Sequence, residues 1–270
     1  MPITKVGDVN LEYYVEGSGP PLLMIMGMGG QALSWGEPFL ERLRPHFKII
    51  RFSNRGTGLS DKPATPFTVP QMADDAAGLL TELGIERAHV LGISLGGMIA
   101  QELVLSHPQR VEGLVLGCTA CGPGHSVPTS QETIAKFGGI VNLPVDERIK
   151  RFWMITIAPE FQETGARFLD EIIGHHLKQP TPLDTFARQM AAASSFDTYE
   201  RLPQIKAPTL IVHGDRDLLI PPGNAEVLQQ RIAGSQVRII AGVAHMFFWE
   251  KPEEASGAIV EFLAKVPVGR

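Results

Sequence analysis

The alternation of apolar and polar positions along residues 1–120 predicts strands and helices that follow one another in turn. Val9–Val15 alternates apolar with polar side chains, which is typical of a half-exposed strand. The continuous apolar runs Pro21–Met26 and Phe47–Phe52 instead indicate strands that are buried on both faces. Val69–Gly84 carries apolar residues at helical spacing and ends in a glycine, so it is predicted to be a helix.

The same rhythm continues into the middle of the chain and returns near its end. A strand, a helix and a strand are predicted at His89–Ile93, Gly97–Ser106 and Val111–Leu116. This order predicts right-handed βαβ units and therefore a mostly parallel sheet. After Pro203 the pattern predicts strands at Thr209–His213 and Gln236–Ile240 and helices at Asn224–Ala233 and Pro252–Lys265.

Residues 121–203 break this rhythm, because they contain helical patterns and no convincing buried strand. These patterns carry large apolar side chains, namely Phe152, Trp153, Met154, Phe161, Phe168, Phe186, Met190 and Phe196. We therefore expect residues 1–120 and 204–270 to form one α/β core and residues 121–203 to form a helical cap. The cap residues also predict an apolar pocket with few charges.

Length and composition limit the classes of protein that fit this pattern. A chain of 270 residues suits one large domain with an insertion, and 44% hydrophobic with 20% charged residues is ordinary for a globular protein. A net charge of −5 argues against a nucleic-acid partner. No apolar run approaches the roughly 18–20 residues of a membrane span, and the first residues lack the pattern of a secretory signal. We expect a cytoplasmic protein with no membrane partner.

Gly92-Ile93-Ser94-Leu95-Gly96 is a G-x-S-x-G sequence that lies between a predicted strand and a predicted helix. A serine on such a sharp turn needs glycines two positions away, because side chains there would crowd the strained backbone. The hydroxyl of Ser94 would then stand clear of the carboxyl edge of the sheet. Ser94 is the candidate nucleophile, and a capping serine at a glycine-rich helix start is the plainer alternative.

A serine nucleophile needs a base, and the base needs a carboxylate. His245 follows the last predicted strand, so its loop belongs to the same edge as Ser94. The loop after Thr209–His213 offers two acids, and we favour Asp217 over Asp215, which would more naturally cap the turn. His213 could orient that loop by a hydrogen bond. The expected chain order is therefore Ser, Asp, His.

Backbone N–H groups are expected to stabilise the oxyanion that forms when a serine attacks a carbonyl. The N–H of Leu95 lies at the start of the helix after Ser94, and the glycine-rich loop after Pro21–Met26 offers the N–H of Met28. Arg55, in the loop after Phe47–Phe52, could bind a substrate carboxylate but more naturally stabilises its own loop.

The two cysteines form a C-x-x-C sequence at Cys118 and Cys121. The glycines and proline that follow Cys121 break a helix, which a thioredoxin-type motif would require. Two cysteines with one nearby histidine also fall short of a zinc set. We expect both to be reduced thiols without a catalytic role, and we expect no metal and no cofactor.

With these residues in place, the sequence resembles the α/β-hydrolase superfamily over nearly its whole length. Gly92–Gly96 resembles the nucleophile elbow, Ser53–Ser60 the loop after strand four, His213–Pro221 the acid loop and Ala244-His245 the histidine loop. The nearest subgroup resembles capped esterases and lactonases, similar to 3-oxoadipate enol-lactonases and to methyl esterases acting on polyketides. Two positions depart from the common pattern, since Met26 and Ala244 stand where the family often has His and Gly.

The resemblance implies an α/β-hydrolase fold, with a mostly parallel eight-stranded sheet flanked by helices and a helical cap, in a monomer or homodimer. It also implies a serine hydrolase of small to medium apolar esters or lactones, with Ser94, Asp217 and His245 as the triad and no cofactor or metal. A carbon–carbon bond hydrolase or a perhydrolase would use the same triad. A ligand sensor with slow turnover is the alternative from a different class of protein.

Overall fold

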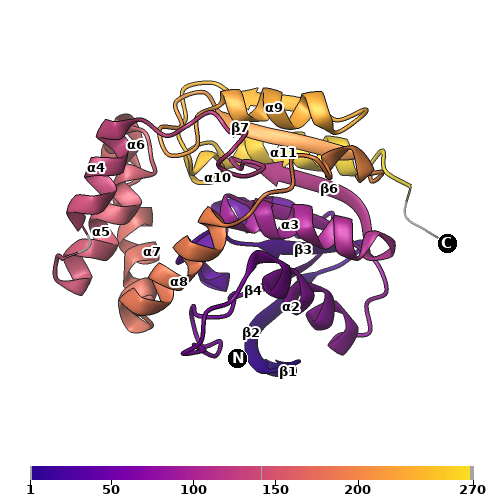
Figure 1. The fold of residues 1–270 in the computed structure, drawn as a ribbon, viewed down its shortest axis with the longest axis horizontal. Coiled ribbons are helices and arrows are strands. Elements are labelled where there is room, and N and C mark those ends of the chain that lie inside the picture. The colour runs from indigo at the N-terminus through magenta and orange to yellow at the C-terminus, as the bar shows by residue number, and fades with distance from the viewer. Residues whose placement is uncertain (1, 141, 268–270) are drawn as a thin grey trace.

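The computed structural model describes residues 2–140 and 142–267, and it is built on one sheet of eight strands. The strand order is β1-β2-β4-β3-β5-β6-β7-β8, in which β1 and β2 are antiparallel to their neighbours and the others are parallel (Figure 1). The strands are β1 Ile3–Val6, β2 Val9–Gly17, β3 Pro21–Ile25, β4 Lys48–Phe52, β5 Ala88–Ile93, β6 Val111–Gly117, β7 Thr209–Gly214 and β8 Gln236–Ile240. The expected mostly parallel eight-stranded sheet is confirmed.

Helices cover both faces of the sheet because the central strands alternate their apolar side chains between two cores. On β3, Leu23 and Ile25 pack into one core together with α2, α3 and α9, whereas Leu22 and Met24 pack into the other with α1 and α11. These helices are α1 Glu37–Leu43, α2 Val69–Glu82, α3 Leu95–Ser106, α9 Gly223–Arg231 and α11 Pro252–Leu263, and the short α10 Phe247–Glu250 precedes α11.

The segment between β6 and β7 forms a group of helices at one end of the sheet, on the left in Figure 1. They are α4 Gln131–Ile140, α5 Val145–Ile155, α6 Pro159–Thr164, α7 Ala166–Lys178 and α8 Leu183–Ser194. Trp153, Leu169 and Ile172 from these helices are buried in the same core as the α1 and α11 side chains. This packing places the cap helices over the loops that leave the carboxyl ends of the parallel strands.

Two short elements lie outside the pattern that the sequence predicts. The strand β1 has only four residues, of which one, Val6, is buried, so apolar alternation is weak there. The helix α1 has seven residues, which is too short to show a clear period. In addition, α3 begins at Leu95, two residues before the predicted start, so the helix begins immediately after Ser94.

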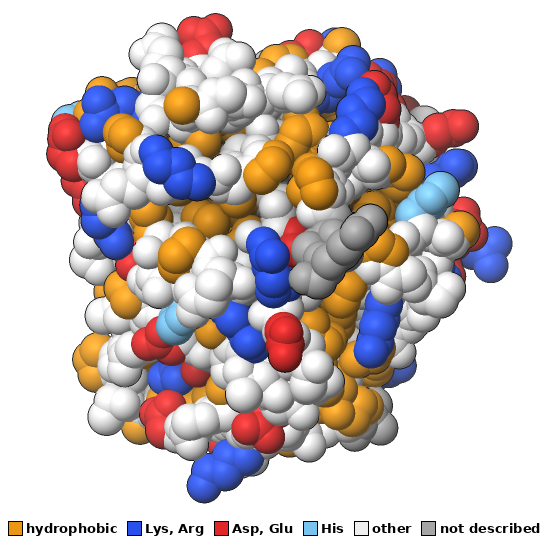
Figure 2. Space-filling view, turned by 90° about the vertical axis from the view of Figure 1, so that its right-hand side faces the viewer, with side chains coloured by type: hydrophobic (Ala, Val, Ile, Leu, Met, Phe, Trp, Pro, Cys, Tyr) orange, Lys and Arg blue, Asp and Glu red, His pale blue; other side chains and the backbone are white. Residues whose placement is uncertain are grey.

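The surface opposite the cap mixes charges of both signs. Figure 2 shows that Lys, Arg, Asp and Glu side chains are interspersed with apolar ones over the part of this face that the structure describes. Within residues 2–140 and 142–267, no helix combines the length and the apolar character needed to cross a membrane.

Candidate active site

Ser94 lies in the turn between β5 and α3 with backbone angles that a non-glycine residue rarely adopts. Its φ is 57° and its ψ is −119°. A Cβ at Gly96 would overlap the carbonyl oxygen of Ile25, and a Cβ at Gly92 would overlap the carbonyl oxygen of Gly96. The two glycines of the motif therefore allow the chain to turn this sharply against β3.

Asp217 and His245 come from two loops at the same edge of the sheet and are joined by a hydrogen bond. The Nδ1–H of His245 donates to Oδ2 of Asp217 over 2.7 Å, and both residues are buried. The other carboxylate oxygen, Oδ1, accepts the N–H groups of Leu219 and Ile220 over 2.9 and 3.0 Å. These two bonds fix the carboxylate, and the bond to Nδ1 leaves Nε2 of His245 as the proton acceptor.

His213 at the end of β7 supports the same loop. A carbonyl oxygen can only accept, so the Nε2–H of His213 donates to the oxygen of Ile220 over 2.8 Å. The same Nε2 lies 3.3 Å from Oδ2 of Asp217. The sequence indicated that His213 could orient this loop, and the structure places it in that position.

The charges of this pair shift the pKa values of both partners. Burial alone would raise the pKa of Asp217, but the imidazole of His245 and the hydrogen bonds outweigh it and lower the pKa to about 2. Burial opposes protonation of His245, but the carboxylate of Asp217 outweighs it and holds the pKa of His245 well above its ordinary value. Asp217 is therefore ionised across the ordinary pH range.

Ser94 and His245 both line one cavity of about 330 Å³ beneath the cap. No hydrogen bond joins the Ser94 hydroxyl to His245 in the described residues; such bonds often tighten only when substrate binds. Met98 and Leu219 from the core and Phe152 from the cap contribute to its apolar wall. Apart from His245, the described residues that line it have no ionisable side chain.

Comparison with known proteins supplies the family. A sequence profile of the alpha/beta hydrolase fold matches residues 20–252, which is most of the chain. The chain belongs to the alpha/beta hydrolase fold family. The resemblance stated from the sequence motifs is thus confirmed at the level of the fold and of general hydrolase character.

Individual alpha/beta hydrolases match over nearly the full length. A poly(3-hydroxyalkanoate) depolymerase from Ectopseudomonas oleovorans is 30% identical over 90% of this chain and 84% of its own. A 2-hydroxy-6-oxononadienedioate/2-hydroxy-6-oxononatrienedioate hydrolase from Paraburkholderia xenovorans is 29% identical over 96% and 92%. The crystal structure of the enol-lactonase from Burkholderia xenovorans LB400 superposes with a TM-score of 0.87 at 24% identity, covering 98% of this chain and all of that one.

In this hydrolase, Met28 and Leu95 both line the cavity that Ser94 and His245 share. Within residues 2–140 and 142–267, the backbone N–H of neither residue has a hydrogen-bond acceptor. A Cβ at Gly27 would lie 3.0 Å from the Cβ of Ser94, so the glycine lets the Met28 loop pass close to the serine. Met28 and Leu95 thus each offer an N–H group without an acceptor in the cavity that Ser94 lines, and their role as an oxyanion site stays a prediction.

Two alternatives that the sequence left open are placed elsewhere by the structure. Asp215 accepts the N–H of Gly242 over 2.7 Å and so ties two loops together on the surface. Arg55 is buried and pairs with Asp75 through Nε over 2.6 Å and with Asp8 through Nη2 over 3.0 Å. The guanidinium of Arg55 is therefore satisfied within the protein and stabilises its own loop.

Cys118 is a neighbour of Asp217 and His245 that sequence reasoning did not assign to the site. It is fully buried, with a φ of 38°. Its Sγ lies within 4.8 Å of a carboxylate oxygen of Asp217 and of a ring nitrogen of His245. Burial raises the pKa of this thiol, and His245 already donates a hydrogen bond to Asp217. Because a metal ligand must be a thiolate, these two observations favour a protonated thiol that packs beside the imidazole over a metal site. The sequence feature that could have assigned Cys118 to the site is its position directly after β6, at the same edge of the sheet as Ser94.

Proposed function

We propose that this protein is a serine hydrolase that cleaves carboxylic esters or lactones through an acyl-enzyme. The observation that carries the proposal is the 2.7 Å hydrogen bond between His245 and Asp217, facing the same cavity as a serine held at a φ of 57°. A carboxylate, an imidazole and a serine on a strained turn are the parts that nucleophilic acyl transfer requires.

In the proposed reaction, the Ser94 oxygen attacks the carbonyl carbon while Nε2 of His245 takes its proton. Asp217 stabilises the imidazolium that results, and the N–H groups of Met28 and Leu95 donate to the oxyanion. The imidazolium then protonates the leaving alcohol as the carbon–oxygen bond breaks. Water attacks the acyl-enzyme in a second step with His245 again as base, which releases the acid and restores Ser94.

The apolar cavity supports uncharged acyl or alkyl groups around the scissile bond. A cavity whose wall carries only His245 as an ionisable group gives no compensation for a charge buried next to the ester. The esterase or lactonase assignment also agrees with the relative from Ectopseudomonas oleovorans, which is named as a poly(3-hydroxyalkanoate) depolymerase.

Hydrolysis of a carbon–carbon bond is the second candidate, because the Paraburkholderia xenovorans relative is named as the hydrolase of an oxo-dienedioate. The same Ser94 and His245 would serve both reactions. A panel of short esters, lactones and vinylogous 1,5-diketones separates the two, since the class on which the enzyme acts should have the higher kcat/KM.

Labelling with a fluorophosphonate, followed by mass mapping of the modified peptide, tests the assignment of the nucleophile. We expect the label on Ser94, and we expect Ser94→Ala to remain folded while losing nearly all activity on p-nitrophenyl butyrate. Full activity in Ser94→Ala, or a label on another serine, would contradict the proposal.

A further inference from the structure

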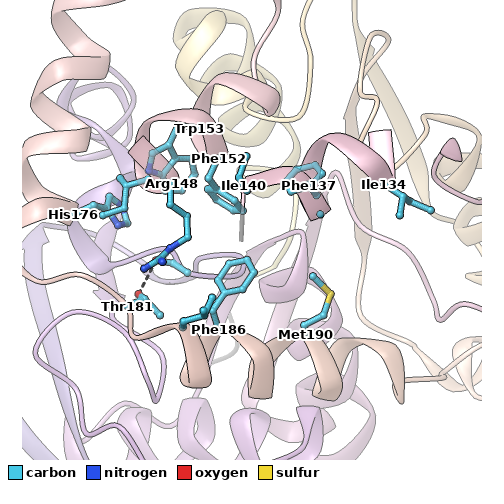
Figure 3. A pocket seen from close by; sticks show the side chains of 14 residues that line it. Ile134, Phe137, Ile140, Arg148, Phe152, Trp153, His176, Thr181, Phe186 and Met190 are labelled. Carbon is cyan, nitrogen blue, oxygen red and sulfur yellow. Dashed lines mark hydrogen bonds between the residues drawn. The ribbon is translucent and has the colours of Figure 1, made fainter. Parts of the chain in front are cut away.

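A second cavity of about 300 Å³ lies within the cap, next to the catalytic one. It is lined by residues of α4, α5, α7 and α8 together with Thr181 and Gly29, and Figure 3 shows its side chains converging from α5 above and α8 below. Its wall is largely apolar, with Ile140, Ile149 and Leu183 among its residues. The size corresponds to a group of on the order of ten non-hydrogen atoms, at ~30 Å³ for each water-sized unit.

The two cavities adjoin, because the same side chains form a wall of each. The shared residues are Ile134, Phe137, Phe152, Trp153, Phe186 and Met190. Phe152 from α5 and Phe186 from α8 meet edge to face at this boundary, with ring centroids 5.6 Å apart. A substrate whose reacting carbonyl lies at Ser94 would have to pass these two rings to reach the second cavity.

Arg148 supplies the positive charge of the second cavity. Its side chain extends from α5 toward Thr181, into the space between α5 and α8 (Figure 3). No carboxylate in the described residues pairs with it, although Arg151 and Arg188 on the cap pair with acids of their own helices. None of the described lining residues is acidic, so the guanidinium faces the cavity without a counter-charge.

The other titratable residue of this wall does not compete for an anion. His176 is buried, and burial lowers its pKa to about 3, so the imidazole is neutral in the ordinary pH range. Its Nε2 lies 2.8 Å from the hydroxyl oxygen of Ser34, which holds the ring toward the core. Arg148 is thus the residue of this cavity that can recognise a negative charge.

We infer, on the basis of the proposed function, that the second cavity binds the far end of the substrate, an apolar chain that ends in a carboxylate held by Arg148. A guanidinium matches a carboxylate through two parallel hydrogen bonds. The apolar walls favour methylene or aryl groups between the ester and the carboxylate, at up to about fourfold in affinity for each buried methylene. The apolar cavity at Ser94 then binds the scissile ester, and the second cavity binds the apolar chain and its terminal carboxylate.

Two series of esters test the inference in the wild-type enzyme, the first followed by absorbance and the second by pH-stat titration of the acid released. One series carries the carboxylate on the acyl side, as mono-p-nitrophenyl esters of linear diacids, and the other carries it on the alcohol side, as butyrate esters of ω-hydroxy acids. Each is compared with the neutral ester of equal length. Above a minimum chain length, we expect kcat/KM to favour the carboxylate in one series by about tenfold, the lower range for a charged hydrogen bond at a half-buried site.

Variants on α5 then ask whether Arg148 causes that preference. Arg148→Gln should bring the ratio of carboxylate to neutral ester close to one, and Arg148→Lys should retain part of it because the charge stays and the paired geometry is lost. Arg151→Gln is the matched control, because Arg151 lies on the same helix, is exposed and does not line this cavity. None of these variants should alter the turnover of p-nitrophenyl butyrate, which is too short to reach the second cavity.

A second variant tests the cavity without changing charge. Leu183 lines the second cavity but not the cavity at Ser94, and it is 40% exposed. Leu183→Trp can therefore fill the second cavity without disturbing a tightly packed core. We expect it to lower kcat/KM for long esters of either kind and to leave butyrate unchanged. Equal carboxylate preference in wild type and Arg148→Gln, or no preference in either series, would overturn the inference.

Binding measured without turnover separates this inference from the proposed function. Calorimetric titration of Ser94→Ala with monomethyl octanedioate should show binding that is about tenfold weaker in Ser94→Ala/Arg148→Gln. Binding that depends on Arg148, with no ester turnover in the wild type, would support the cavity assignment and reject the esterase. Ester turnover with Arg148-independent binding would support the esterase and reject the cavity assignment.

Discussion

Replacement of Asp217 by asparagine should reverse the tautomer of His245, because the structure fixes which way the new amide faces. Oδ1 accepts the N–H groups of Leu219 and Ile220. If the amide nitrogen faced them, two buried donors would lose their acceptor, at about 1–3 kcal/mol each. The asparagine oxygen therefore stays with the backbone, and its NH₂ group takes the place of Oδ2 beside Nδ1 of His245.

An NH₂ group can only donate, so Nδ1 of His245 must become the acceptor and the proton must move to Nε2. The imidazole then presents N–H to Ser94 and cannot take its proton. The same replacement in serine proteases lowers kcat by about 10⁴-fold, which corresponds to roughly 5.4 kcal/mol in activation free energy. We expect a loss of this order for Asp217→Asn on p-nitrophenyl butyrate, with a melting temperature close to that of the wild type.

Asp215→Asn is the matched control for this experiment. Asp215 lies two residues away and accepts only the N–H of Gly242, on the surface. Its replacement should leave kcat within a factor of about two to three, because exposed substitutions away from a site rarely exceed ~0.5 kcal/mol. If Asp217→Asn kept a tenth of the wild-type kcat, or if Asp215→Asn lost as much as Asp217→Asn, the assignment of the acid would be wrong.

Three further outcomes are expected. First, kcat/KM should fall as pH falls through the raised pKa of His245, because the base must be neutral; the pH–rate profile should place this acid limb above the ordinary value of 6.5. Second, Gly96→Ala should destabilise the fold by more than ~4 kcal/mol in chemical denaturation, since its Cβ would overlap the Ile25 oxygen, whereas Gly124→Ala meets open space. Third, burial raises the pKa of Glu250 to about 7, so the folded state holds this proton more tightly than the unfolded state does. The free energy of unfolding should therefore fall as pH rises from about 4.5 to 7, and the melting temperature of Glu250→Gln should lack this pH dependence.

Each of these has a result that contradicts it. An acid limb at or below pH 6.5 would remove Asp217 as the cause of a raised His245 pKa. Equal unfolding free energies for Gly96→Ala and Gly124→Ala would show that the turn does not need its glycine. A melting temperature whose pH dependence is the same in Glu250→Gln and the wild type would exclude Glu250 as the titrating group.

The core fold and the chain order of the candidate site could be predicted from sequence because they depend on local patterns. Buried parallel strands are continuous apolar runs, and β3 and β4 match the predicted runs to within one residue at each end. The G-x-S-x-G turn is also local, since the glycines and the serine all lie within five residues and a Cβ at Gly92 would overlap the carbonyl oxygen of Gly96 in the same turn. Short elements such as β1 and α1 gave too little pattern to be seen.

Contacts between distant segments were decided only by the tertiary structure. The sequence offered Asp215 and Asp217 two residues apart with the same chemistry, and only the folded loops direct Asp217 to His245 and Asp215 to Gly242. The sequence indicates only an ordinary thiol at Cys118, and the fold places it beside the imidazole of His245 at the end of β6.

The sequence by itself determined the order of strands and helices, the turn that exposes Ser94 and the apolar character of the cap. Those features follow from periodicity and backbone sterics, which act between residues near one another in the chain. The tertiary structure decided which acid meets the imidazole, that Arg55 is neutralised by Asp75 and Asp8, and that Arg148 faces a cavity with no carboxylate partner among the described residues. Such pairings depend on how loops and helices from distant parts of the chain pack, and no local pattern encodes them.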